Sequence, residues 1–245
     1  MISTRITLAI AQRALRELRR EPRSFVFLVG APALLLCVVR YVFNSPEEFA
    51  GTGVMMVGVF PAFSMMVVGS IMVVRERNRG TLEAVLATPA SRLELVCGYL
   101  AAAVTLAFFQ ALCTTAVAFG VCDLDTASPV WLVGLVAMLS GIFGMSLGLA
   151  VSALSKNEGE ASHFIPGAMV PQLLISGCFW PVAEMTSWLR AVEGYLPLSA
   201  VTRSMTALRE NPYGGMPLVY SVIAMLAIIA VAQVGAAASI RRRTA

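Results

Sequence analysis

Charged residues are scarce in this sequence. They make up 13% of its 245 residues, whereas hydrophobic residues make up 58%. A soluble domain carries about 25% charged residues, so too few are present here to cover a water-facing surface. The scarcity is also uneven, because six long segments contain no Asp, Glu, Lys or Arg: 24–39, 49–74, 95–122, 126–155, 161–183 and 211–240. The composition therefore excludes an ordinary soluble domain and predicts a membrane protein.

The residue types that carry catalysis and metal binding are also nearly missing. The only lysine is Lys156, and no G-x-x-x-x-G-K-[ST] motif surrounds it, so this sequence cannot form a phosphate-binding loop of that kind. The only histidine, His163, has no acidic or cysteine cluster beside it, and the five cysteines show no C-x-x-C spacing. We therefore expect no enzyme activity, metal site or cofactor in this chain, and a structural role for His163.

The uncharged segments predict six membrane-spanning helices. A helix needs about 20 apolar residues to cross about 30 Å of hydrocarbon, and five of the six segments are long enough. The first continues past Arg40 to Phe43, because an arginine near a helix end can extend to the headgroups. We expect an all-α membrane protein with a single transmembrane domain over 1–245, whose spans lie at about 24–43, 53–74, 95–121, 130–154, 162–180 and 217–240.

The basic residues gather on one side of these spans. Of the eighteen Lys and Arg residues, fourteen lie in the N-terminal leader, the second and fourth connections and the C-terminal tail, and three lie between spans five and six. The first and third connections hold acidic residues instead: Glu47, Glu48, Asp123 and Asp125. Because basic loops stay in the cytoplasm, we expect both termini there. The net charge of +4 is thus a topology signal, and we expect no nucleic-acid partner.

Residues 2–20 have the pattern of an amphipathic helix. Ile6, Ile10, Ala14 and Leu18 recur every four residues, and arginines occupy the other side. Such a helix lies in the membrane interface with its apolar face in lipid. The alternative is a disordered basic tail. In the fourth span, small residues also recur every fourth position and favour a close approach of two helices, first within the subunit and second between subunits: Ser140, Gly144, Gly148 and Ser152.

The segment 181–213 between spans five and six is too long for a turn. Its pattern predicts two short helices, Met185 to Val192 and Ala200 to Glu210, with Ser199 as the N-cap of the second. Trp180, Trp188 and Tyr195 are residue types that settle at membrane interfaces. We expect a non-spanning, re-entrant helical hairpin on the outer side.

The loop 75–93 between spans two and three is the most informative segment. Gly80 can end the helical extension of span two, Thr81 can cap a short helix, and Pro89 stops it. Ser91 and Glu94 have the spacing of a capping box that opens span three. A short capped helix between two spans can transmit force from a cytoplasmic partner. The alternative is a stiff polar connector, which spacing alone does not exclude.

Three segments resemble the ABC-2 type transporter permease family. Val74-Arg-Glu-Arg77, Gly80-Thr-Leu-Glu83 and Thr88-Pro89 look like the family's coupling helix, which contacts the ATPase subunit. Leu15 to Pro22 resembles its N-terminal connecting helix, and Ile175 to Pro181 resembles its fifth-span end. The resemblance covers essentially the whole chain and is closest to the daunorubicin/doxorubicin-resistance drug-export permeases. Asn78-Arg79 depart from many members, which leaves the specificity for the ATPase partner open.

The resemblance implies a permease subunit of an ATP-driven exporter in the bacterial plasma membrane. A second permease copy or paralogue, two ATPase subunits that hold ATP and Mg, and membrane lipids are its expected partners. The cargo would be hydrophobic or amphiphilic drugs or lipid-like compounds; a polysaccharide or lipid-linked glycan exporter and an ion-coupled secondary transporter are the alternatives. The implied coupling residues are Arg75, Glu76, Arg77, Gly80, Thr81, Leu82, Glu83, Thr88 and Pro89. The candidates lining the substrate path in spans two and five are Met56, Phe60, Phe63, Met169, Gln172 and Leu173.

Overall fold

The structure is a computed structural model that describes residues 4–19, 22–43, 45–78, 91–155 and 157–239. Within these ranges the regular secondary structure is helical, as the sequence predicts, and strands are absent from them. The helices are α1 (Thr4–Arg19), α2 (Pro22–Val42), α3 (Pro46–Asn78), α5 (Arg92–Gly120), α6 (Val130–Leu154), α7 (Glu158–Ile175), the 3₁₀ turn η1 (Val182–Glu184), α8 (Ser187–Glu193), α9 (Pro197–Glu210) and α10 (Gly215–Ser239).

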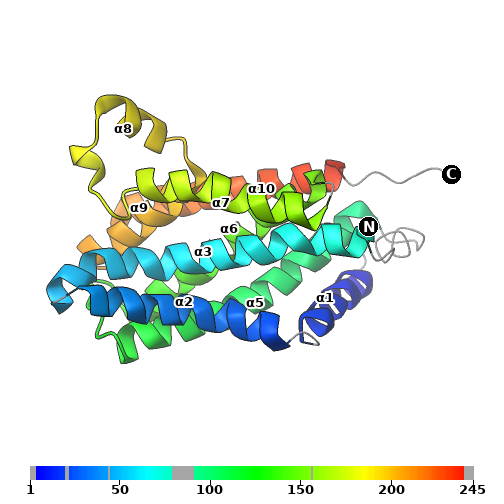
Figure 1. The fold of residues 1–245 in the computed structure, drawn as a ribbon, viewed down its shortest axis with the longest axis horizontal. Helices are drawn as coiled ribbons and strands as arrows, with labels where there is room; N and C mark the ends of the chain where they lie inside the picture. Colours follow the sequence, from blue (N-terminus) through cyan, green and yellow to red (C-terminus); the bar gives the residue numbers. More distant parts are fainter. Residues whose placement is uncertain (1–3, 20–21, 44, 79–90, 156, 240–245) are drawn as a thin grey trace.

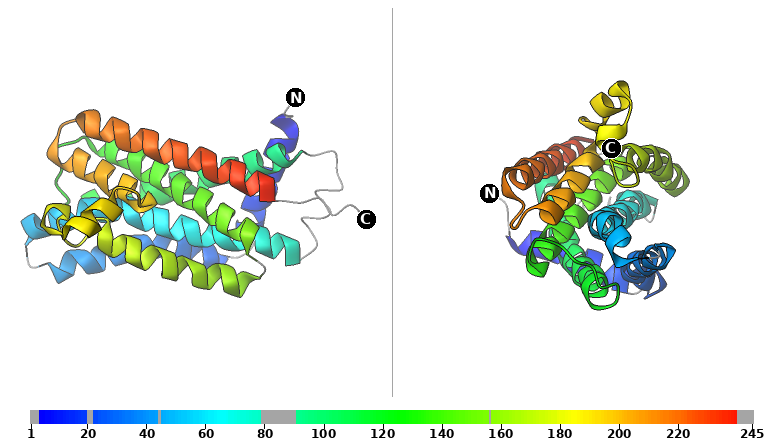
Figure 2. Two further views of the ribbon diagram at one scale, coloured as in Figure 1. Left: turned by 90° about the horizontal axis from the view of Figure 1, so that it is seen from above. Right: turned by 90° about the vertical axis from the view of Figure 1, so that its left-hand side faces the viewer.

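Six of these helices form an elongated bundle, and each coincides with a predicted span. They are α2, α3, α5, α6, α7 and α10, and they run side by side along the long axis of the molecule (Figures 1 and 2). Four contain segments long and apolar enough to cross a membrane: Glu48–Glu76, Glu94–Gly120, Val130–Leu154 and Gly215–Ala238. The apolar part of α2, Leu28–Val42, is shorter, and α7 has only 18 residues with two glutamates in its first turn.

The outer surface of the bundle is rich in exposed apolar side chains. On α10 these include Ile223, Leu226, Val231 and Val234, each more than half exposed. Soluble proteins rarely expose continuous apolar patches beyond a few hundred Å², whereas lipid tails solvate such a surface without cost. The chain is therefore a multi-pass membrane protein.

The closest helix packing in the bundle joins α3 to α6. A Cβ atom added at Gly144 would lie 1.9 Å from the carbonyl oxygen of Ala62, and one added at Gly148 would lie 2.3 Å from that of Met66. Only glycine lets the two backbones approach so closely. The predicted small-residue stripe is confirmed, and at these two positions it serves packing within the chain.

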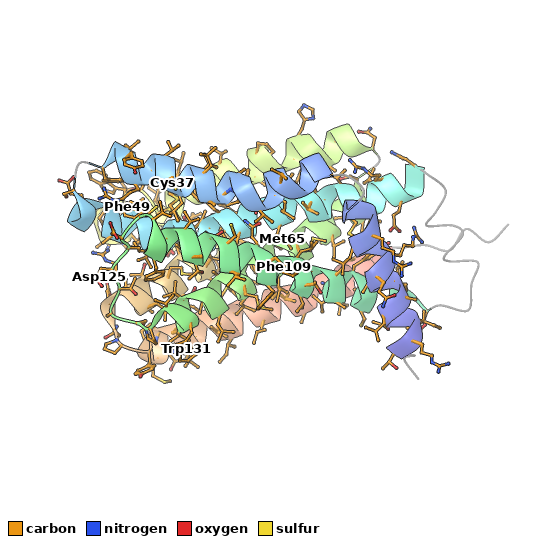
Figure 3. All side chains as sticks on the ribbon, turned by 90° about the horizontal axis from the view of Figure 1, so that it is seen from below. Cys37, Phe49, Met65, Phe109, Asp125 and Trp131 are labelled. Carbon is orange, nitrogen blue, oxygen red and sulfur yellow. The ribbon has the colours of Figure 1, made fainter. Side chains whose placement is uncertain are left out.

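Helix α1 crosses the end of the bundle and packs against α5 (Figure 3). Ile10, Ala11 and Ala14 are buried, and a Cβ atom at Gly98 would lie 2.6 Å from Cγ2 of Ile10. The predicted amphipathic helix is present. Its apolar face was expected in lipid, which is wrong for Ile10 and Ala14, because these side chains pack on protein.

The turn η1 and the helices α8 and α9 lie at the opposite end of the bundle, where α8 projects outward (Figure 1). Asp125 and Phe49 lie at this same end (Figure 3). The prediction that Ser199 caps α9 is wrong: α9 begins at Pro197, with Leu196 as its N-cap. Proline is favoured in the first helical turn because its fixed φ angle suits the helix and its missing N–H needs no partner there.

Candidate functional site

The predicted coupling segment begins in the last turns of α3. Arg75, Glu76 and Arg77 belong to this helix, which ends at Asn78. The other six predicted coupling residues, Gly80, Thr81, Leu82, Glu83, Thr88 and Pro89, lie outside the described residues. Within the described residues, the site is the junction where α3 ends, α5 begins and α1 crosses the bundle.

Glu76 is the centre of this junction. Its side chain is only 5% exposed although it carries a carboxylate. The hydroxyl of Tyr99, on α5, donates a hydrogen bond to Oε2 of Glu76. Nη2 of Arg13, on α1, lies 3.4 Å from Oε1. One buried carboxylate thus joins three helices, and we call Arg13, Glu76 and Tyr99 the Glu76 cluster.

The energetics of the Glu76 cluster explain why it holds α1, α3 and α5 together. A buried carboxylate without partners is strongly unfavourable, so Glu76 keeps its position only while its partners stay in place. A hydrogen bond to a charged group contributes about 1.5–3 kcal/mol. The ion pair with Arg13 contributes less, about 1 kcal/mol or below, because the Arg13 side chain is 32% exposed. A displacement of the end of α3 must therefore move α1 and α5 with it or break these contacts.

Helix α6 holds the same end of α3 from the other side. The backbone N–H of Val74 donates to Oγ of Ser152 over 3.0 Å, and both groups are buried. Ser152 belongs to the small-residue stripe predicted in span four, one turn beyond Gly148. The end of α3 is thus fixed between α6 and the Glu76 cluster.

The start of α5 is fixed by the predicted capping box. The backbone N–H of Glu94 donates to Oγ of Ser91 over 3.2 Å, and the N–H of Ser91 donates to Oε2 of Glu94 over 2.7 Å. Both hydrogen bonds are present, so the prediction is confirmed. The box thus fixes the start of α5.

We expect Ser91→Ala to weaken this helix start. Loss of an N-cap hydroxyl costs about 1 kcal/mol, because the amide of Glu94 loses its partner. Thermal unfolding of the purified protein in detergent should show a lower melting temperature for Ser91→Ala and nearly the wild-type value for Ser91→Thr. Equal melting temperatures for all three proteins would contradict the assigned cap.

The predicted path residues lie on α3 and α7, which pack against each other. Met56 and Met169 are buried in the core of the chain, whereas Phe63 is 37% exposed. Phe60 and Leu173 are partly buried against the same core. Gln172 has a local structural partner, because its Oε1 accepts a hydrogen bond from the N–H of Leu198 over 3.3 Å. This contact ties α7 to the first turn of α9.

Arg13 and Tyr99 are site residues that the sequence reasoning did not single out. Arg13 belongs to the cationic side of the predicted N-terminal helix, which is expected to face the lipid headgroups, and no sequence motif includes Tyr99. The available signal was weak: a glutamate at the end of one span and a tyrosine one turn into the next. Their meeting depends on how α1 crosses the bundle.

The described residues bring together no group of three His, Cys, Asp or Glu side chains that could hold a metal ion. His163 is exposed on α7, where Nδ1 lies 2.6 Å from the carbonyl oxygen of Gly159 in the preceding turn. The polar contacts described at this end of the bundle therefore link α3 to α1, α5 and α6.

Comparison with known proteins identifies related membrane domains. The family model described as "ABC-2 type transporter" matches residues 6–209. The chain is 26% identical over 147 residues to the "Probable multidrug ABC transporter permease YbhR" of Escherichia coli (strain K12), covering 60% of this chain and 40% of YbhR. It is 28% identical over 151 residues to "ABC transporter G family member 20" of Dictyostelium discoideum, covering 62% of this chain and 20% of that protein. The chain thus spans well under half the length of these relatives.

Proposed function

Because the chain belongs to the ABC-2 type transporter family, we propose that it is the membrane-spanning permease subunit of an ATP-driven exporter. The matched domain is a transport domain and not an enzyme, and the 245 residues contain no phosphate-binding loop around Lys156. ATP and Mg then belong to a partner ATPase. The cargo we propose is a hydrophobic or amphiphilic drug or lipid-like compound, because the related YbhR is described as a probable multidrug permease.

The proposed topology has six spans, formed by α2, α3, α5, α6, α7 and α10. Helix α2 and helix α7 count as spans because they run alongside the four long apolar helices (Figure 2). The Glu76 cluster then faces the cytoplasm of a bacterial plasma membrane, as do both termini, because the basic segments lie at that end. The helices α8 and α9 lie at the outer side.

The observation that carries this proposal is the Glu76 cluster. It sits where α3 runs into the predicted coupling loop, and it links that point to α1 and α5. ATP-driven closure of two ATPase subunits would push the loop 75–93 and α1 together, and the cluster would pass this movement to the spans. Two packings of the bundle, facing inward and outward, would alternate in this way. A second copy of the chain, or a paralogue, completes the exporter.

Purification of the tagged chain from its native membrane tests the proposal. We expect a nucleotide-binding subunit to co-purify in stoichiometric amount, with ATP hydrolysis stimulated by amphiphilic drugs. Stimulation by a glycan precursor and not by drugs would assign the polysaccharide or lipid-linked glycan cargo instead. Recovery of the chain alone, without ATPase activity, would contradict the ATP-driven exporter and favour an ion-coupled carrier.

Two substitutions in the loop test the coupling role of residues 80 and 83. We expect Gly80→Pro to lower export per ATP hydrolysed, because proline removes a backbone N–H and restricts the turn that glycine permits. We expect Glu83→Ala to do the same, because it removes a carboxylate from the segment that the family resemblance assigns to the ATPase contact. Membrane insertion should be unchanged in both. Normal drug export by both variants in proteoliposomes would refute the coupling assignment, and Glu48→Gln, an exposed change at the far end of α3, is the control.

A further inference from the structure

A cavity of about 1070 Å³ lies at the end of the bundle opposite to the Glu76 cluster. Its walls come from the start of α3, the segment after α7, the turn η1 with α8, and the helices α9 and α10. The hydroxyl of Thr202 on α9 donates a hydrogen bond to the carbonyl oxygen of Ser176 over 2.7 Å, which links α9 to the end of α7. Neither the predicted path residues nor the described coupling residues Arg75, Glu76 and Arg77 line this cavity.

One wall carries a buried ion pair. Glu193, at the end of α8, has a side chain only 3% exposed, although Arg203 beside it is 52% exposed. Nε of Arg203 donates to Oε1 of Glu193 over 3.1 Å, and Nη2 donates to Oε2. This bidentate pairing neutralises Glu193 and fastens α8 to α9. The carboxylate is therefore committed to Arg203 and is not available to attract a cationic ligand.

Two further donors at the cavity have no partner within the described part of the chain. Oγ of Ser199 is buried without a hydrogen bond. The guanidinium of Arg209 is exposed, and neither a hydrogen bond nor an ion pair is formed by it. A Cβ atom at Gly51 would lie 3.2 Å from its Nη1 atom, so the guanidinium rests over the glycine. Ser199 lies ten residues before Arg209 on α9, about 15 Å along the helix axis, so Arg209 is the donor that a ligand head group can reach.

The remaining wall is apolar and continues into the surface of the bundle. Tyr220, Ala224 and Ile228 line the cavity along one stripe of α10. The neighbouring α10 residues Val219 and Ile223 are exposed, as is Tyr220. Phe179 and Trp180 add exposed aromatic rings at the rim. The cavity thus has the guanidinium of Arg209 at one end and an apolar side that leads to the lipid-facing surface of α10.

We propose that this cavity binds an anionic amphiphile. Its carboxylate or phosphate head pairs with the guanidinium of Arg209, and its hydrocarbon tail lies along α10. Charge favours an anion: once the paired Arg203 and Glu193 are set aside, the lining holds Arg190 and Arg209 against Glu210. Guanidinium groups are the preferred protein partners of carboxylate and phosphate. The ligand is either a membrane lipid or the exported cargo, since both have this chemistry. The site goes beyond the coupling role and can be tested without it.

A photoreactive fatty acid tests the site directly on the full chain in nanodiscs of zwitterionic lipid. The probe carries a diazirine in its tail, and the matched neutral probe is its monoacylglycerol. We expect the acid to label peptides from α9 and α10 at the cavity, and the neutral probe to label them about tenfold less, the effect of losing one charge-assisted hydrogen bond. Equal labelling by both probes would overturn the proposal.

Variants separate the head-group contact from the tail contact. Arg209→Gln should reduce labelling by the acid to the level of the neutral probe, whereas Arg209→Lys should retain most of it. Ala224→Trp should block both probes by filling the apolar side, and Ala116→Trp, an exposed change on α5, is the matched control. Wild-type labelling in Arg209→Gln and Ala224→Trp would overturn the site. Folding of each variant is checked by its elution as a sharp peak in detergent.

The source of the ligand follows from competition. If added phosphatidylglycerol displaces the probe, the site takes a membrane lipid. If only an anionic drug that stimulates the ATPase displaces it, the site takes cargo. Displacement by neither would overturn an anion-selective site. Labelling needs no ATPase, so it can succeed even if the chain proves not to be an exporter. Absence of labelling would likewise leave the coupling measurements unaffected.

Discussion

Gly144→Ala is expected to lower the melting temperature of the protein by about 2–12 °C. The new methyl group would sit 1.9 Å from the backbone oxygen of Ala62, so α3 must move away from α6. Overpacking of this kind costs about 1–3 kcal/mol and sometimes more, and each kcal/mol shifts the melting temperature of a chain this size by roughly 2–4 °C. Tryptophan fluorescence during heating in detergent measures the change.

The control for this substitution is Gly235→Ala on α10. A Cβ atom at Gly235 meets nothing within 4 Å, so alanine adds only its higher helix propensity, about 1 kcal/mol or less. We expect an unchanged or slightly raised melting temperature there. A similar fall in both variants would show that the effect of Gly144→Ala does not come from the contact between α3 and α6.

Glu76→Gln is expected to reduce export about tenfold while the partner ATPase continues to hydrolyse ATP. Glutamine keeps the shape and can still accept from Tyr99, but it loses the charge that faces Arg13 and strengthens both contacts. A loss of about 1.4 kcal/mol corresponds to a factor of ten, within the range for a hydrogen bond to a buried charged group. Drug accumulation and phosphate release in the same proteoliposomes measure the two activities.

Matched variants distinguish coupling from a general loss of stability. Tyr99→Phe removes one hydrogen bond of the Glu76 cluster, and Arg13→Gln removes the ion pair. If the cluster acts as one joint, Arg13→Gln combined with Glu76→Gln should lose less than the product of the single losses. Glu48→Gln, the same change at the exposed far end of α3, should behave as wild type. Undiminished export in Glu76→Gln and Tyr99→Phe would refute the proposal that the Glu76 cluster transmits movement to the spans.

Elements that depend on local chemistry were predictable. The capping box of Ser91 and Glu94 needs only two residues three apart, and the glycine stripe of α6 needs only a fixed spacing on one helix. The helices themselves follow from long uncharged segments. The N-cap of α9 was predicted wrongly at Ser199. Pro197 favours a helix start two residues earlier, and in the structure α9 begins at Pro197.

The sequence by itself determined that this chain is a helical membrane protein, where its bundle helices lie, and which end carries the basic charge. Those properties depend on the transfer of apolar segments into lipid and on hydrogen bonds within single helices, and both are local in sequence. Only the tertiary structure decided that Arg13, Glu76 and Tyr99 meet, and that Arg209 of α9 borders one cavity with the apolar stripe of α10. These groups come from different helices, and their distances depend on how closely α3 approaches α6 and where α1 crosses α5. Side-chain packing sets that geometry, and spacing along the chain does not encode it.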